Sequence, residues 1–299
     1  MKKYVLFLAI ILLGLLPGCT IDFPESAPAA SQVSGSLTVY YLDVGQADCT
    51  LVQLPDQKTM LIDAGNNSDG LLIADFLKKQ EISTIDYMVL THPHEDHIGG
   101  ADVIIRSFGV GEVYMPRIKD SLVPTTQTYE EVLDALEEKE VQVNAAVNGM
   151  QILQNGSLSV SCLSPYGDYS DLNHYSVVVR LDYGEASFLF TGDAEEKNER
   201  EMIANRVELD VDILKVGHHG SNYSSCREFL QATSPQYAII SVGAKNRYGH
   251  PSDAAINRFY DYGTEMVYRT DLNGTVIVET DGVNFTVRTD NNIMLDGSR

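Results

Sequence analysis

The sequence predicts an α/β protein of the αββα sandwich type, in which two mixed β-sheets pack face to face and helices cover the outer faces. The main observation is the order of segments: short apolar or β-branched runs bounded by Gly, Pro and Asp precede amphipathic helical stretches, and this order occurs twice. A second observation is size, because 299 residues with 44% hydrophobic side chains can enclose a large core. Two sheets that each bury one face, with helices outside, satisfy both observations.

The first cycle of this pattern starts near residue 36. Its last helix has Val132, Leu133 and Leu136 at helical spacing, with acidic residues on the other side. Strands are predicted at residues 37–44, 49–54, 59–63, 87–90 and 112–115, and helices at residues 71–79, 101–106 and 128–139.

The second cycle repeats the order from residue 150 onward. No short-period repeat or low-complexity segment interrupts it. Strands are predicted at residues 150–153, 158–163, 176–181, 186–190, 211–216, 237–242, near 267, 275–279 and 284–288, and helices at residues 194–205, 227–232 and 252–262.

The N-terminus has the composition of a targeting segment. Lys2 and Lys3 precede an apolar run at residues 4–16, which is too short to span a membrane comfortably as a permanent helix. The run ends in Leu-Pro-Gly-Cys19, which resembles the lipobox of bacterial lipoproteins. The resemblance implies that Cys19 becomes the lipidated first residue and holds the protein on the extracytoplasmic face of the cell membrane. Ordinary secretion or an uncleaved anchor is the alternative.

The chain is therefore predicted to have four parts. The stretch after the leader is rich in Pro, Ala and Ser, which is typical of a flexible tether. The parts are a lipoprotein signal peptide at residues 1–18, the tether at residues 19–35, a folded domain at residues 36–290 and a C-terminal tail at residues 291–299.

Charge and cysteine content exclude some classes of site. The net charge of −21, which becomes more negative when the leader lysines are removed, argues against broad electrostatic capture of nucleic acid. Cys49, Cys162 and Cys226 lie in no CxxC spacing, so a thiolate metal site is not expected. Small buried hydrophobic side chains are the simplest interpretation of the three cysteines, and one disulfide among them is left open.

The most informative motif is the run Thr-His-Pro-His-Glu-Asp-His at residues 91–97, directly after an apolar strand. Two residues apart in extended chain, His92 and His94 point the same way and can bind one ion. Asp96 and His97 follow a turn and can face a second ion. Imidazole and carboxylate groups at this density are costly to pack without a cation, so the motif predicts a metal site.

Further candidate ligands lie at other predicted strand ends. Asp193 follows the apolar strand at residues 186–190, and the pair His218–His219 follows the strand at residues 211–216. His174 and His250 lie in loops as well, so that every histidine is at or near a predicted strand-to-loop junction and none is in the middle of a predicted helix. Strand ends on one sheet edge can converge, which predicts one shared site.

Several motifs in this order resemble those of the metallo-β-lactamase superfamily. They are Leu61-Ile-Asp63-Ala-Gly65, His92-x-His94-x-Asp96-His97, Thr191-Gly-Asp193 and the later His218. Three more motifs resemble the extracellular domain of ComEC-type competence proteins, which the chain would represent without the membrane channel. They are Leu42-Asp-Val-Gly-Gln-Ala-Asp48, Lys215-Val-x-His-His-Gly-Ser221 and Asn246-x-Tyr-x-His-Pro251.

The resemblance implies a centre with two divalent metal ions, Zn²⁺ or Mn²⁺. Metal one would be held by His92, His94 and a shared Asp193, and metal two by Asp96, His97, Asp193 and His218. A water bridging the ions would be the nucleophile, with Asp96 orienting it. Asp63, Asp43 and His219 are expected to support the ligands from behind. Because the donors are rich in oxygen and lack thiolate, we expect Mn²⁺ to restore activity better than Zn²⁺.

The chain departs from the superfamily pattern where a third histidine for metal one is expected. The corresponding residues are Asn173 and His174, and either could complete the site; Asn173 is favoured as a weak or substrate-side ligand. His250 is expected to bind substrate phosphate or protonate the leaving group, with a helix-capping role as the alternative. The other candidates for substrate contact are Ser176, Ser221, Asn246 and Tyr248.

The resemblance implies an exported, membrane-tethered, metal-dependent hydrolase that cleaves a phosphodiester, with DNA as one candidate substrate. A cell-wall phosphocholine diester is an alternative, because it would need less basic surface. Hydrolysis of a lactone, thioester or β-lactam is a second class of function, and metal-dependent binding without catalysis is a third. No protein partner can be inferred.

Overall fold

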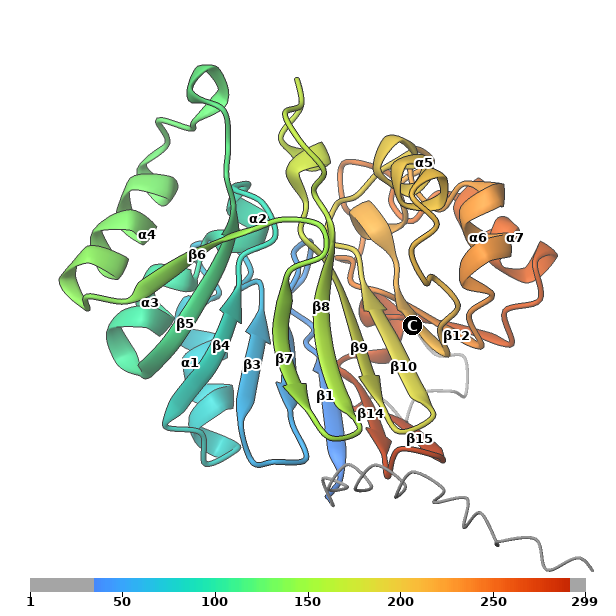
Figure 1. Ribbon diagram of the computed structural model, residues 1–299, viewed down its shortest axis with the longest axis horizontal. Coiled ribbons are helices and arrows are strands. Elements are labelled where there is room, and N and C mark those ends of the chain that lie inside the picture. The colour runs from blue at the N-terminus through green and yellow to red at the C-terminus, as the bar shows by residue number, and fades with distance from the viewer. Residues whose placement is uncertain (1–34, 291–299) are drawn as a thin grey trace, which may run out of the picture. The chain divides into compact units, whose positions relative to one another are not determined.

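The computed structural model describes residues 35–290, in which two β-sheets lie face to face and helices cover both outer faces (Figure 1). The predicted αββα sandwich is confirmed. The predicted signal peptide, Cys19, nearly all of the tether and the C-terminal tail lie outside the described residues. Within residues 35–290, no helix is both long and apolar enough to cross a membrane.

The first sheet has eight strands in the order β15-β14-β1-β2-β3-β4-β5-β6. The run from β3 to β6 is parallel, and the other pairs are antiparallel. The strands are β1 (Leu37–Tyr41), β2 (Thr50–Gln53), β3 (Thr59–Ile62), β4 (Thr84–Val89), β5 (Gly109–Pro116), β6 (Gln142–Ala146), β14 (Val276–Thr280) and β15 (Phe285–Thr289).

The second sheet has seven strands in the order β13-β12-β11-β10-β9-β8-β7. The run from β10 to β13 is parallel, and β7 to β10 are antiparallel. The strands are β7 (Gln151–Asn155), β8 (Leu158–Ser164), β9 (Val178–Tyr183), β10 (Ala186–Phe190), β11 (Ile213–Lys215), β12 (Tyr237–Ile240) and β13 (Met266–Arg269).

Three longer helices cover each sheet (Figure 1). On the first sheet they are α1 (Gly70–Lys79), α3 (Ala101–Ser107) and α4 (Gln127–Glu138), and on the second α5 (Glu196–Ala204), α6 (Arg227–Thr233) and α7 (Asp253–Asp261). Short helical turns are α2 (Glu95–Ile98), α8 (Thr270–Asn273), η1 (Asp120–Leu122), η2 (Asn173–Tyr175) and η3 (Gly217–Gly220).

The apolar core has three layers that follow from the strand patterns. The central layer joins both sheets, with Val39 and Tyr41 of β1 in one cluster with Phe188 and Phe190 of β10. Alternate residues of β1 are buried here, as expected for a strand with one face on the core. The two outer layers lie between each sheet and its helices. Burial on both faces explains why β3 is buried throughout and carries the apolar run Met-Leu-Ile after Thr59.

The structure differs from the predicted elements in two respects. Strand β6 was not predicted, because its sequence Gln-Val-Asn-Ala-Ala contains a single β-branched residue and is mostly exposed at the edge of the sheet. The histidines expected in plain loops partly lie in short helical turns: His97 in α2, His174 in η2, and His218 and His219 in η3.

The cysteine thiols within residues 35–290 are all free. Cys49 and Cys162 are buried in different core layers, so the disulfide that the sequence left open does not form in this structure.

Candidate metal centre

The centre is built by loops that leave the carboxyl ends of four strands. In the first sheet, Asp63 follows β3 and residues 91–97 follow β4, which runs parallel to it. In the second sheet, Asp193 follows β10 and the His218–His219 pair follows the parallel strand β11. The two edges meet, since the backbone N–H of Val177 donates to the carbonyl of Thr91. Carboxyl ends of parallel strands share an edge, and here two such edges face one another.

Asp63 fixes the orientation of His97. Its buried carboxylate accepts hydrogen bonds from the backbone N–H and the hydroxyl of Thr91, each at 2.8 Å, and its Oδ2 lies 2.7 Å from Nδ1 of His97. The Nε2 of His97 therefore points away from Asp63 and lies 3.2 Å from Oδ1 of Asp193. A carboxylate behind a histidine is the usual way to hold a metal ligand in place.

Asp193 is the centre of the arrangement, and its two oxygens face different sets of side chains. On the Oδ2 side, Nε2 of His92 lies at 3.8 Å and Nε2 of His218 at 3.7 Å. His94 adjoins this set, with Nδ1 2.9 Å from Nε2 of His92.

The Oδ1 side of Asp193 holds a second set. Nε2 of His97 lies at 3.2 Å and Nε2 of His219 at 3.7 Å from Oδ1. Asp96 joins this set through its Oδ2, which lies 3.3 Å from Nε2 of His219. The donor atoms of Asp96, His97 and His219 all lie within 4.8 Å of one another, as do those of His92, His97 and Asp193. One carboxylate between two groups of donors is the arrangement that a two-metal site requires.

The His218–His219 turn aims the two rings at opposite sides of Asp193. Both residues have left-handed backbone angles, with φ of 48° and 51°, which is a strained conformation for residues other than glycine. His219 is buried and its Nδ1 lies 2.9 Å from the carbonyl of Ser241. The Nδ1 of His218 lies 3.0 Å from Oε1 of Glu195. In each ring, Nε2 is left facing the centre.

A second layer of charge lies behind the ligand groups. Asp48 and Lys215 are both buried and form an ion pair of 2.7 Å. The other oxygen of Asp48 lies 3.5 Å from Nδ1 of His219. Asp48 and Lys215 belong to two separate motifs of the sequence, the Leu-Asp-Val-Gly-Gln-Ala-Asp opening and the Lys-Val-x-His-His-Gly-Ser run. The fold thus brings these two motifs into direct contact.

The buried polar atoms at the centre fit a cation. Within residues 35–290, Nε2 of His97, Oδ1 of Asp193 and Nε2 of His219 are buried and have no hydrogen-bond partner. Leaving three such atoms unsatisfied would cost on the order of 1–3 kcal/mol each. A divalent ion on each side of Asp193 would satisfy all three, and the donors are imidazole and carboxylate, which suit Zn²⁺ and Mn²⁺.

The pKa shifts of these side chains also fit a bound cation. Burial disfavours charge on Asp193, yet His97 and His219 hold the pKa of its carboxyl well below the ordinary value. Burial also opposes charge on His97, but Asp193 and Asp63 raise its pKa well above the ordinary value. Burial lowers the pKa of His92 well below the ordinary value, so this ring is neutral and offers a lone pair.

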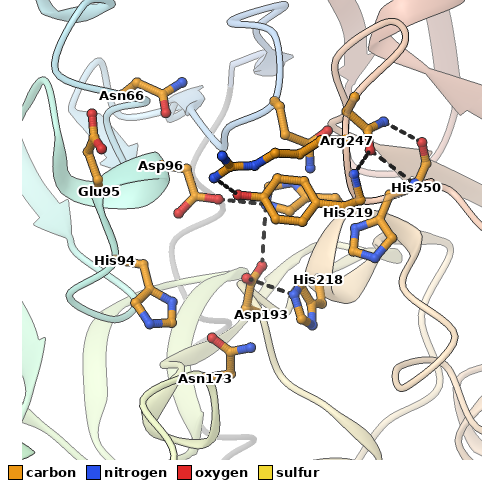
Figure 2. A pocket seen from close by; sticks show the side chains of 13 residues that line it. Asn66, His94, Glu95, Asp96, Asn173, Asp193, His218, His219, Arg247 and His250 are labelled. Carbon is orange, nitrogen blue, oxygen red and sulfur yellow. Dashed lines mark hydrogen bonds and ion pairs between the residues drawn. The ribbon is translucent and has the colours of Figure 1, made fainter.

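An open cavity of about 600 Å³ gives access to the centre (Figure 2). Asp96, Asp193, His218 and Arg247 point into it from different loops. It is lined by Gln46, Asn66, His94, Glu95, Asp96, Asn173, Asp193, His218, His219, Asn246, Arg247, Tyr248 and His250.

The predicted ligands His92, His94, Asp96, His97, Asp193 and His218 all lie in this region. The structure places His218 and His219 on different sides of Asp193 from those expected. His219, expected only to support the ligands, lies with Asp96 and His97 on the Oδ1 side, where His218 was expected. His218 lies on the Oδ2 side, where the sequence lacks the third histidine of the superfamily pattern.

Asn173 and His174 lie differently with respect to the cavity. Asn173 lines the cavity, and its Oδ1 is buried without a hydrogen-bond partner in the described part of the chain. His174 does not line the cavity, and its Nε2 lies 3.2 Å from Oε2 of Glu195. The structure therefore favours Asn173 as the substrate-side group.

Three other expectations are not met. Asp43 is exposed and accepts a hydrogen bond from the N–H of Gly45, away from the cavity; Asp48 holds the supporting position instead. Ser176 and Ser221 are buried, so neither is open to a substrate. Ser176 instead accepts a hydrogen bond from the N–H of Asp193. His250, Asn246 and Tyr248 do line the cavity, as expected.

Some residues of the site were not predicted. Glu195 contacts His218, His174 and Asn173 together, and Arg247 brings a cation to the cavity wall. Glu195 belongs to no motif, and Arg247 occupies the unspecified second position of the Asn246–Pro251 motif. Gln46, Asn66 and Glu95 also line the cavity and were not predicted to do so.

Comparison with known proteins identifies the family. The sequence profile of the metallo-beta-lactamase superfamily matches residues 42–244. The chain belongs to the metallo-beta-lactamase superfamily. Members of this superfamily are generally metal-dependent hydrolases, and the paired donor groups on Asp193 agree with that chemistry.

Among metallo-beta-lactamase relatives, the chain is 33% identical over 254 residues to ComE operon protein 3 of Bacillus subtilis, covering 79% of this chain and 32% of the relative. It is 30% identical over 265 residues to competence protein ComA of Neisseria gonorrhoeae, covering 88% of this chain and 34% of the relative. The chain thus spans about a third of the length of these relatives. The crystal structure of CmlA, a diiron β-hydroxylase from Streptomyces venezuelae, shares the fold with a TM-score of 0.53 and 20% identity, over 79% of this chain and 53% of that one.

Proposed function

We propose that this protein is a binuclear metal-dependent phosphodiesterase that acts on nucleic acid. The observation that carries the proposal is the division of donors about Asp193. His92 and His218 lie near one oxygen, with His94 beside His92, and His97 and His219 lie near the other, with Asp96 beside His219. Two ions held in this way would lower the pKa of a water molecule and neutralise charge on a transferring phosphoryl group.

Residues that line the cavity would orient the water and bind the substrate phosphate. The Oδ2 atom of Asp96 lies 3.3 Å from Nε2 of His219 and the side chain faces the cavity, so its carboxylate can orient a water molecule there. His250 has a buried Nδ1 without a hydrogen-bond partner in residues 35–290, and its ring centre lies 5.4 Å from that of His218. We assign His250 to contact with the substrate phosphate.

Two further observations support a phosphodiester over a lactone, thioester or β-lactam. The cavity wall is polar and includes a guanidinium, which suits an anionic substrate. The relatives include a protein named as a competence protein, and the resemblance of the motifs to ComEC-type domains implies DNA as the substrate. The net charge of −21 limits binding to contacts near the cavity.

The test uses the full chain purified in detergent, stripped with a chelator and reloaded with Mn²⁺ or Zn²⁺. We expect hydrolysis of single-stranded DNA and of bis(p-nitrophenyl) phosphate, with Mn²⁺ restoring more activity than Zn²⁺. Asp193→Asn should lose bound metal and activity, whereas Asp86→Asn, far along the sheet, should keep both. A metal-loaded protein that cleaves neither substrate would overturn the proposal, and hydrolysis of a β-lactam, lactone or thioester instead would favour the alternative enzyme class.

We also propose that the chain is anchored by lipid at Cys19 on the extracytoplasmic face of the cell membrane. The proposal rests on the leader and lipobox-like sequence. The full chain should partition into the detergent phase of a Triton X-114 extract, and Cys19→Ser should move to the aqueous phase. Aqueous partition of the unaltered chain would contradict a lipid anchor.

A further inference from the structure

Tyr248 lies at the wall of the cavity with 54% of its surface exposed. It is linked to the metal centre by two ring contacts, since its ring centre lies 5.8 Å from that of His250 and the His250 ring lies 5.4 Å from that of His218. An aromatic ring in this position can contact the part of a substrate next to the reacting phosphate.

The turn that carries Tyr248 is held in one conformation by Asn246. The Asn246 side-chain oxygen accepts hydrogen bonds from the backbone N–H groups of Tyr248 and His250, at 3.1 and 3.0 Å. Its amide nitrogen donates to the carbonyl of Gly243 at 3.0 Å. Because the turn is ordered in advance, binding to Tyr248 loses little conformational entropy.

Arg247 covers part of the Tyr248 ring. Its guanidinium carbon lies 5.0 Å from the ring centre, and Nη2 donates to the tyrosine hydroxyl at 2.8 Å. Among the described residues that line the cavity, Arg247 is the one with a permanent positive charge. In a chain with a net charge of −21, this guanidinium is an unusual feature and fits an anionic ligand.

The pairing of Arg247 with Tyr248 distinguishes two kinds of phosphodiester. A choline headgroup binds aromatic rings through its cationic ammonium, but here a guanidinium already lies on the ring and would repel it. A nucleobase is neutral and flat, and it can stack both on an exposed aromatic ring and on a guanidinium plane. The arrangement therefore favours a base over a choline group.

We propose that Arg247 and Tyr248 form a subsite for an unpaired nucleobase beside the phosphodiester. The base stacks on the exposed ring and guanidinium, and the remaining N–H groups of Arg247 contact a flanking phosphate. A base within a duplex is covered by its neighbours on both faces, so the subsite accepts unpaired strands. The subsite rests on the proposed function for its phosphodiester, but its own test is a binding measurement.

The test compares two fluorescein-labelled oligomers with phosphorothioate linkages that resist hydrolysis, an oligothymidylate and the same backbone with abasic sites. Binding to the metal-loaded full chain is measured by fluorescence anisotropy. We expect the thymidylate to bind about tenfold more tightly than the abasic oligomer. Tyr248→Ala should abolish this preference and Tyr248→Phe should keep it. Arg247→Ala should weaken binding of both oligomers.

Tyr260→Ala is the matched control, because Tyr260 is an equally exposed tyrosine on α7 outside the cavity. It should behave as the unaltered chain does, and bound metal should be equal in all variants. Equal binding of the two oligomers by the unaltered chain, or a preference that survives Tyr248→Ala, would overturn the subsite. Failure of the metal-loaded, unaltered chain to hydrolyse either single-stranded DNA or bis(p-nitrophenyl) phosphate would instead overturn the proposed function, and the base preference would still decide the subsite.

Discussion

Asp63 shows how a single buried carboxylate can set the geometry of the metal centre. It adopts a left-handed backbone angle, with φ of 58°, and accepts three hydrogen bonds from Thr91 and His97. Those contacts leave His97 with its Nε2 toward Asp193. The strained backbone is stabilised by the same contacts, because each of them needs the carboxylate in this position.

We expect Asp63→Asn to weaken metal binding about 10- to 100-fold. The amide of asparagine would present a donor to groups that are themselves donors, so His97 would lose its fixed orientation. A competition titration with a chromophoric chelator measures the affinity. Asp86→Asn is the control, since Asp86 accepts a hydrogen bond from the N–H of Thr59 at the opposite end of the strands. Equal affinities in the two variants would contradict this role of Asp63.

At the residue scale, the sequence singled out the clustered histidines more readily than the charges around them. His92, His94 and His97 were selected because their spacing is itself informative. Glu195 belongs to no motif, and Asp48 belongs to one that does not reveal its partner; only the folded chain brings Asp48 to Lys215 and Glu195 to His218. The exchange of His218 and His219 depends on two backbone angles that no pattern in the sequence reveals.

At the scale of elements, helices α5 and α7 clamp the loop that follows the His218–His219 turn. Glu199 of α5 is buried and accepts hydrogen bonds from the backbone N–H groups of Ser225 and Cys226. Arg258 of α7 donates to the carbonyls of Ser224 and Ser225. Two side chains from different helices thus bind the same two peptide groups, those that follow Ser224 and Ser225. Glu199 binds their N–H groups and Arg258 binds their carbonyl oxygens.

Glu199 should make stability depend on pH. Burial raises the pKa of this carboxyl from 4.5 to about 7 in the folded protein. The folded protein keeps the proton where the unfolded chain has lost it, so the stabilisation is complete below about pH 4.5 and is lost as the pH rises through 7. The free energy of unfolding should fall by up to ~3 kcal/mol over this range because of this group.

Urea denaturation of the unaltered chain and of Glu199→Gln between pH 4.5 and 8 measures this contribution. The free energy of unfolding of the unaltered chain should fall relative to that of Glu199→Gln as the pH rises, because the variant lacks the titrating group. Parallel pH curves for the two proteins would show that Glu199 does not titrate in this range.

The elements with strong periodicity were predicted from the sequence, and those set by their neighbours were not. Helix α4 shows apolar spacing in the sequence, and Val132 and Leu136 are buried as expected, whereas Leu133 is 42% exposed. Strand β6 was missed because it is an edge strand whose only ladder partner is β5, so its polar side chains need no apolar alternation. The turns α2, η2 and η3 are too short for any periodicity to show.

At the scale of the whole molecule, the buried pair of Asp48 and Lys215 joins the two sheets. Asp48 lies in the loop between β1 and β2, and Lys215 ends β11 of the other sheet. The pair lies directly behind the ligand groups, and Lys215 also donates to the carbonyl of Val216 at 3.0 Å. The two halves of the metal centre are therefore aligned by charge as well as by apolar packing.

We expect Lys215→Met to lower the free energy of unfolding by about 3–5 kcal/mol, because it leaves the Asp48 charge buried and unpaired. Adding Asp48→Asn to this variant should recover more than half of the loss. Chemical denaturation measures both values. Lys78→Met, which removes an exposed lysine from a weak contact with Asp75, should change the value by less than about 0.5 kcal/mol. Additive losses in the double variant would show that the two residues do not act as a pair.

The strained turn at His218 and His219 should couple the binding of one metal ion to the binding of the other. The two residues are adjacent, and each points its Nε2 at a different oxygen of the same Asp193. An ion on either side would therefore fix both the Asp193 carboxylate and the turn, and the second ion would find its donors already immobilised. Metal uptake by this protein should be positively cooperative, with the doubly loaded form dominating over the singly loaded one at every stage of a titration.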